Sequence, residues 1–104
     1  MSKYSIKELW EEIYGKQVEA YDYAGRLMLK SACGDPHSRF QPTIDHIRPQ
    51  SAGGKDAKGN IVICNWETNE EKDNHFPHWK TNGHSFHAKR ENCNEIKYRI
   101  IKER

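Results

Sequence analysis

The sequence predicts an α+β fold of short elements, in one domain spanning residues 1–104. A length of 104 residues fits a single domain. The spacing of apolar residues changes along the chain, from a helical period near the N-terminus to the alternation typical of strands. Apolar residues make up only 35% of the chain, so the core must be small. We expect large aromatic side chains to supply much of it: Trp10, Tyr21, Phe40, Trp66, Trp79, Phe86 and Tyr98.

Charge and cysteine content exclude several classes of protein. The net charge of +2 is too small to indicate a polyanionic partner by itself, although the chain after Lys80 is mildly basic. Cys33, Cys64 and Cys93 are odd in number and form no CxxC pair, which argues against a disulfide framework or a thiolate zinc site. No segment has the length and hydrophobicity of a signal peptide or a membrane span. We therefore expect a soluble, cytoplasmic protein with reduced cysteines.

The first part of the chain predicts a helix and then a hairpin. Ser5 followed by Glu8 fits a capping box, and the apolar spacing that follows predicts a helix over residues 6–14. Residues 18–29 alternate on either side of the turn-forming residues 22–25, which predicts a β-hairpin. The helix is expected to pack against the core and not to contact a substrate.

The middle of the chain predicts a strand, a long loop and a second strand. A short strand near residues 40–47 carries Asp45 and His46, and it ends before Pro49, which lacks an amide hydrogen. Residues 50–59 are polar and rich in glycine, so they are expected to cross the surface. The apolar residues 60–64 predict the second strand.

The last part of the chain predicts one more helix and a group of strands. Residues 65–73 have a helical pattern, with Trp66 facing inward and three glutamates facing solvent, and Pro77 prevents the helix from continuing. Residues 79–86 predict two strands joined by a type I′ turn at Asn82-Gly83. Residues 95–102 predict a final strand, with a helix as the alternative.

Asp45 and His46 are expected to have different chemical roles. Neighbouring residues on a strand point to opposite faces, so the two side chains are not expected to bind one ion together. A carboxylate suits Mg²⁺ or Mn²⁺, whereas an imidazole can accept a proton from water near neutral pH. A hairpin would bring Asn60 beside His46, where an oxygen could accept a hydrogen bond from the ring. Asn69, on the helix that follows, could complete the protein ligands of the ion opposite Asp45.

These residues form an ordered motif that resembles a known family. Asp45-His46, Pro49, Gly53-Gly54, Asn60, Asn69 and Lys72 occur in the order seen in HNH nucleases of the ββα-metal fold. The hairpin residues Asp22 and Gly25-Arg26, with the Lys72-Asp73 run, also resemble a phage and bacterial subgroup. The sequence departs from many relatives in lacking the two CxxC pairs that bind a structural zinc. The resemblance implies a small ββα core at about residues 43–74, flanked by the N-terminal helix, the preceding hairpin and the C-terminal strands. Gly53 and Gly54 are interpreted as residues that allow the loop conformation, not as phosphate-binding residues.

The resemblance also implies an activity and a set of roles. Asp45 and Asn69 would hold one divalent metal ion, His46 would be the general base, and Asn60 would orient it. Mg²⁺ or Mn²⁺ is the expected ion, with Ni²⁺ or Zn²⁺ as alternatives. The substrate would be double-stranded DNA, cut to a 5′ phosphate. A monomer with one active site is expected to nick one strand. Arg48, Lys55 and Lys72 are candidate DNA phosphate contacts.

Two other functions remain open at this level. One is a nucleic-acid-binding module that has the fold but does not cleave. The other is a zinc-stabilised interaction domain built on His75 with His78 or His84 with His87, together with Cys93. Both histidine pairs have i, i+3 spacing, but the turn residues near them argue against convergence on one helix face.

Overall fold

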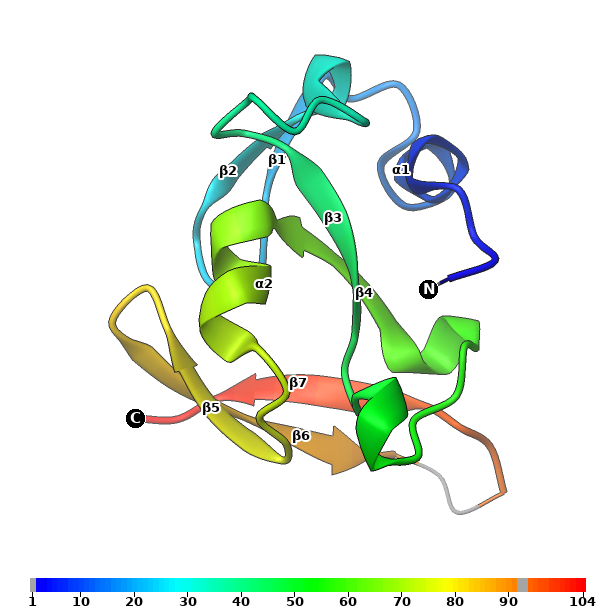
Figure 1. Ribbon diagram of the computed structural model, residues 1–104, viewed down its shortest axis with the longest axis vertical. Helices are drawn as coiled ribbons and strands as arrows, with labels where there is room; N and C mark the ends of the chain where they lie inside the picture. The colour runs from blue at the N-terminus through cyan, green and yellow to red at the C-terminus, as the bar shows by residue number, and fades with distance from the viewer. Residues whose placement is uncertain (1, 92–93) are drawn as a thin grey trace.

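The computed structural model describes residues 2–91 and 94–104 and confirms the α+β class. In these residues three antiparallel sheets form, with strand orders β1-β2, β3-β4 and β5-β6-β7. Figure 1 shows α1 and the β1–β2 hairpin at one end, the β5–β7 sheet at the other, and β3, β4 and α2 between them. The helices are α1 (Ile6–Tyr14) and α2 (Trp66–Lys72), and the strands are β1 (Glu19–Tyr21), β2 (Leu27–Leu29), β3 (Pro42–His46), β4 (Ile61–Asn65), β5 (His78–Thr81), β6 (His84–Arg90) and β7 (Tyr98–Lys102).

Helix α1 forms where the sequence predicts it and covers the first hydrophobic cluster. The Ser5 hydroxyl accepts a hydrogen bond from the Glu8 amide at 3.4 Å, which caps one of the free amides of the first turn. The helix ends at Gly15, which has a positive φ of 62°. Its inner face buries Leu9 and Trp10 against Met28 of β2 and Ile63 of β4. The helix and the hairpin therefore pack against the β3–β4 sheet.

The C-terminal sheet encloses the second cluster. Trp79 of β5 and Phe86 of β6 pack with Ala24 and Ile47. The predicted type I′ turn is confirmed, since Asn82 and Gly83 both have positive φ, at 50° and 75°.

The aromatic residues divide between core and surface. Trp10, Trp79 and Phe86 are buried, as predicted. Tyr21, predicted to be an anchor, is 69% exposed because it lies on a short edge hairpin. The three other predicted anchors are half-buried: Phe40, Trp66 and Tyr98. The prediction that Trp66 faces inward is wrong, since its indole nitrogen donates to the Arg39 carbonyl at 3.1 Å near the surface.

Polar side chains, rather than continuous strands, join the three sheets. Asp22, in the first hairpin turn, accepts hydrogen bonds from the Asn65 amide at 3.0 Å and the Thr68 hydroxyl at 2.6 Å. Arg26 of the same turn donates to Thr81 at 2.9 Å and to Glu71 at 2.8 Å. The first hairpin is thus fastened both to the start of α2 and to the β5–β6 turn.

Candidate active site

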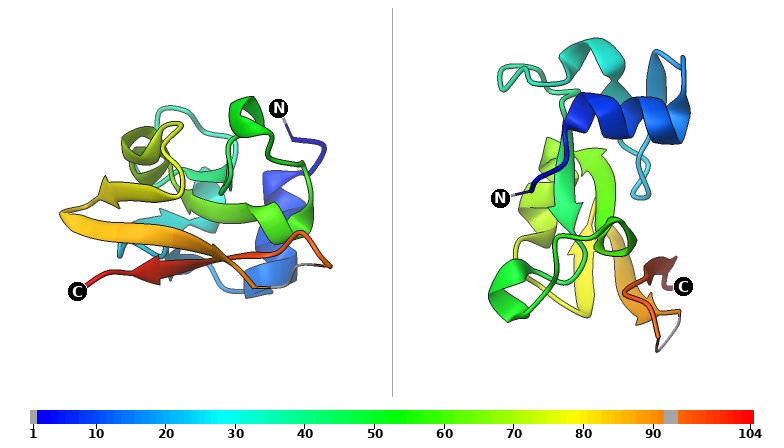
Figure 2. Two further views of the ribbon diagram at one scale, coloured as in Figure 1. Left: turned by 90° about the horizontal axis from the view of Figure 1, so that it is seen from below. Right: turned by 90° about the vertical axis from the view of Figure 1, so that its right-hand side faces the viewer.

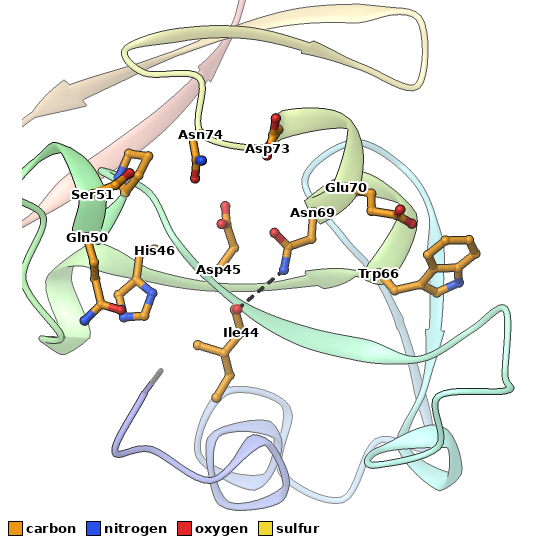
Figure 3. Close-up of a pocket in the computed structure, with 11 residues that line it drawn as sticks. Ile44, Asp45, His46, Gln50, Ser51, Trp66, Asn69, Glu70, Asp73 and Asn74 are labelled. Carbon is orange, nitrogen blue, oxygen red and sulfur yellow. Dashed lines mark hydrogen bonds between the residues drawn. The ribbon is translucent and has the colours of Figure 1, made fainter.

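The side chains predicted to carry the chemistry meet at an open pocket of about 850 Å³ between the end of β3 and α2. The antiparallel pairing of β3 with β4 sets Asp45 opposite Val62 and His46 opposite Ile61. Figure 3 shows Asp45 and Asn69 side by side, with His46 on the other side of Asp45. The lining residues are Ile44, Asp45, His46, Pro49, Gln50, Ser51, Trp66, Asn69, Glu70, Asp73 and Asn74.

Asp45 is a buried carboxylate at the floor of the pocket. Its side chain is 9% exposed, and Oδ2 lies 3.3 Å from the Lys72 Nζ atom. Burial raises the pKa of Asp45 to about 6, although the positive charge of Lys72 acts in the opposite direction. The Oδ2 atom is buried and has no hydrogen-bond partner among the described residues. A carboxylate held in this way is suited to a cation that approaches from the pocket.

Lys72 does not occupy the surface position expected of a phosphate contact. Its side chain is 0% exposed, and Nζ donates to the His46 carbonyl at 3.2 Å. The ammonium group also lies 5.1 Å from the centre of the Trp79 ring. Because the cation is enclosed by Asp45, His46 and Trp79, a DNA phosphate cannot reach it without opening the core. Lys72 is therefore an internal counter-ion of Asp45, which corrects the prediction.

Asn69 presents an oxygen to the same pocket. Its Nδ2 atom donates to Thr43 Oγ1 at 3.1 Å and to the Ile44 carbonyl at 3.5 Å. These contacts turn the carboxamide so that Oδ1 remains available, and Figure 3 shows this oxygen on the side of Asp45. A carboxylate and a carboxamide oxygen form a donor set for a hard divalent cation such as Mg²⁺ or Mn²⁺. The arrangement fits the predicted pair of metal ligands.

The imidazole of His46 is held by a residue that sequence reasoning missed. Its Nε2 atom lies 2.8 Å from Asp56 Oδ1, and the His46 side chain is 13% exposed. Asp56 also accepts from Ser2 Oγ and from the Lys3 amide, each at 2.7 Å. The Lys3 amide, followed by His46, lowers the pKa of Asp56 to about 2. With a carboxylate at Nε2, a neutral imidazole carries its proton there and leaves Nδ1 free to accept one.

Asn60 acts on the loop rather than on the imidazole ring. It is fully buried, and its Oδ1 accepts from the Arg48 amide at 2.8 Å. Its Nδ2 donates to the carbonyls of Arg48, at 3.0 Å, and Lys55, at 2.8 Å. The prediction of a direct hydrogen bond to the His46 ring differs from this geometry, because the strand register aims the amide at the chain just after His46. Asn60 closes the base of the loop that follows the histidine.

The two other predicted phosphate contacts lie on this loop. Arg48 is half-buried, donates from Nε to the Ala52 carbonyl at 2.9 Å, and places its guanidinium 5.9 Å from the Phe76 ring centre. Lys55 is exposed. Gly54 approaches the Arg48 carbonyl so closely that an added Cβ would lie 1.7 Å from that oxygen. The glycine has a structural role in the loop, as predicted.

In a comparison with protein-family models, residues 37–78 match the model described as HNH endonuclease. This segment contains Asp45, His46, Asn60 and Asn69 together with β3, β4 and α2. Comparisons with curated proteins and with solved structures give no match. Among the described residues, no helix is both long enough and apolar enough to cross a membrane. Residues 37–78 are thus similar to the HNH endonuclease family, in agreement with the resemblance seen in the sequence.

Proposed function

We propose that this protein is a metal-dependent nuclease that hydrolyses phosphodiester bonds of double-stranded DNA. HNH endonucleases act on DNA and generally use a divalent metal ion. The observation that carries the proposal is the meeting of Asp45, His46 and Asn69 at one open pocket, with the His46 ring oriented by Asp56. The whole chain acts as one unit in this proposal, because Ser2 contacts Asp56 from the N-terminal segment.

Asp45 and Asn69 would hold the ion through their carboxylate and carboxamide oxygens. Lys72 compensates the charge of Asp45 on its buried side and keeps the carboxylate in place. Oxygen donors favour Mg²⁺ or Mn²⁺, with Ni²⁺ or Zn²⁺ as alternatives. When bound, such an ion supplies positive charge that offsets the negative charge developing on the phosphate.

His46 would act as the general base. Nδ1 takes a proton from the attacking water while Nε2 remains hydrogen-bonded to Asp56, whose negative charge stabilises the imidazolium that results. The buried amide of Asn60 keeps the chain after His46 in position. With water attacking phosphorus opposite the 3′ oxygen, the bond from phosphorus to that oxygen would break. The products would be a 5′ phosphate and a 3′ hydroxyl group that takes its proton from solvent.

Arg48 and Lys55 would contact DNA phosphates from the loop beside the pocket. Such contacts neutralise backbone charge without reading sequence, so binding should weaken as salt increases. With one candidate active site among the described residues, a monomer is proposed to cut one strand at a time. The first product from supercoiled plasmid would then be the open circle.

The test is cleavage of supercoiled plasmid by the purified protein with Mg²⁺, Mn²⁺, Ni²⁺, Zn²⁺ or excess chelator. Wild type is compared with His46→Ala and with His37→Ala, an exposed histidine outside the pocket. Loss of the general base should reduce the rate at least about a hundredfold, while His37→Ala should leave it unchanged. Equal cleavage by wild type and His46→Ala would refute the assignment. DNA binding without cleavage under every metal would favour the non-catalytic binding module instead.

A further inference from the structure

Three side chains of types that can ligate a metal gather on the outer face of the C-terminal sheet, away from the pocket. His78 of β5 is paired directly with His87 of β6. Glu103 follows β7, and its amide donates to the Ser85 carbonyl of β6 at 2.8 Å. Since side chains alternate between the faces of a strand, this register brings all three to one face. Figure 2 shows β5, β6 and β7 running side by side.

The distances within this cluster are close to those of a bound ion. Glu103 Oε2 lies 3.4 Å from His87 Nδ1 and 3.7 Å from His78 Nδ1. One ligand atom from each residue lies within 4.8 Å of the other two. In a tetrahedral zinc site, with ligands about 2.0 Å from the ion, ligand atoms are about 3.3 Å apart. Small rotations of the side chains would therefore complete the site.

The surroundings of the His87 ring also favour a bound metal ion. Its Nδ1 atom is buried and, although it lies 3.4 Å from Glu103 Oε2, it makes no hydrogen bond among the described residues. A buried ring nitrogen without a partner is costly unless it meets a cation or a proton. His78, in contrast, has a side chain that is 69% exposed, so the cluster is open to solvent on one side. The cluster thus combines a buried ring nitrogen that makes no hydrogen bond with a side that is open to an ion.

We propose that His78, His87 and Glu103 form a second metal site, which binds a transition-metal ion of the Zn²⁺ class. Two imidazoles and one carboxylate favour Zn²⁺, Co²⁺, Ni²⁺ or Cu²⁺ over Mg²⁺, while a fourth position remains for water. The oxygen ligands Asp45 and Asn69 have the opposite preference. The two sites are therefore separated by chemistry as well as by position.

This site uses different partners from those suggested by the spacing of histidines in the sequence. An i, i+3 pairing would join His84 with His87, yet on strand β6 these two residues lie on opposite faces. His75 does not belong to the cluster of potential ligands. Cys93 lies outside the described residues. Strand pairing brings together His78 and His87, which are nine positions apart.

Because the three ligands come from separate strands, an ion would tie β5, β6 and β7 together. It would bind the folded sheet far better than the unfolded chain, so it should stabilise the protein. The ion would be structural, and DNA cleavage in the pocket would not require it. This inference does not depend on the proposed nuclease activity.

The test measures Co²⁺ and Zn²⁺ binding to the full chain after treatment with chelator. Visible absorption of bound Co²⁺ reports the coordination geometry, and competition with Zn²⁺ gives the affinity. The variants are His78→Ala, His87→Ala and Glu103→Gln, with His84→Ala as the control on the same sheet and Asp45→Asn as the control for the pocket. Loss of the His87 ligand should weaken Zn²⁺ binding at least about a hundredfold, while both controls keep wild-type affinity.

Thermal unfolding supplies a second readout that does not depend on spectroscopy. Zn²⁺ at about a hundredfold excess over its dissociation constant should raise the Tm of wild type by roughly 10 °C, and that of His87→Ala hardly at all. Without metal, the variants should unfold near the wild-type temperature, because the residues lie on the outer face. The proposal is overturned if His87→Ala binds Zn²⁺ as wild type does. It is also overturned if Asp45→Asn abolishes the binding, which would assign the ion to the pocket.

Discussion

Replacing Lys72 with methionine tests whether a buried cation sustains the charge of Asp45. Methionine keeps an apolar stem of about the same length and removes the ammonium group, whose Nζ lies 3.3 Å from Asp45 Oδ2. The pKa of Asp45 already stands at about 6, against an ordinary 3.8. At about 1.4 kcal/mol for each tenfold change in proton affinity, this rise amounts to about 3 kcal/mol. Removing one partner of a buried pair costs about 3–5 kcal/mol, unless the remaining group becomes neutral.

The sign of the effect depends on pH. Folded protein holds the Asp45 proton more tightly than the unfolded chain, so this group makes stability fall as pH rises from about 4 to about 6. Lys72 limits that fall in wild type by attracting the carboxylate. Lys72→Met should therefore be less stable than wild type by about 3 kcal/mol at pH 8. The difference should close or reverse near pH 4, where Asp45 is protonated and Lys72 has lost its charged partner.

The assay is urea unfolding of both proteins in chelator at pH 4, 6 and 8. Lys55→Met, which changes an exposed lysine of the neighbouring loop, serves as the matched control and should stay within about 0.5 kcal/mol of wild type. A deficit of equal size at all three pH values would refute the reasoning, since it would show that packing of the lysine stem matters rather than its charge.

Three further predictions concern the pocket and its loop. Divalent metal affinity should fall about tenfold between pH 7 and pH 5 because Asp45, with a pKa near 6, becomes protonated; calorimetry with Mn²⁺ would show this, and a flat profile would exclude Asp45 as a ligand. Asp56→Asn should lower kcat for DNA cleavage at least about tenfold while leaving Mn²⁺ affinity unchanged, and an unaltered kcat would show that Asp56 does not orient His46. Asn60→Ala should destabilise the fold by about 2–4 kcal/mol in urea unfolding, because the Arg48 amide and two carbonyls lose their buried partner; a loss under about 1 kcal/mol would contradict this.

Local patterns in the sequence predict most of the elements to within a few residues. Helix α1 has the predicted bounds because Ser5 and Gly15 mark its ends by local chemistry. The Asn82-Gly83 turn is equally local, since both residues tolerate positive φ. The division into three separate sheets was beyond such reasoning. It depends on contacts between distant side chains, such as those of Asp22 and Arg26.

The residues of the candidate site were likewise only partly predictable from the sequence. Asp45, His46 and Asn69 could be named from an ordered motif, and the structure brings them to one pocket. Lys72 could not be placed correctly, because a lysine close to glutamates on a short helix has the pattern of an exposed residue. Its burial follows from pairing with Asp45, which is 27 positions away. One feature of the sequence could have identified Asp56 as a partner of His46: it is the only acidic residue between His46 and Glu67.

The contacts of the first hairpin turn bear on how the protein matures during synthesis. Asp22 bonds to residues that follow it by 43 and 46 positions, and Arg26 to one that follows it by 55. The hairpin and α1 leave the ribosome long before these partners do. Their final polar contacts must therefore wait until α2 and the β5–β6 turn have emerged. Because α2 carries Asn69, the same late event that fastens the hairpin also positions this candidate ligand, so an unfinished chain would lack the assembled site.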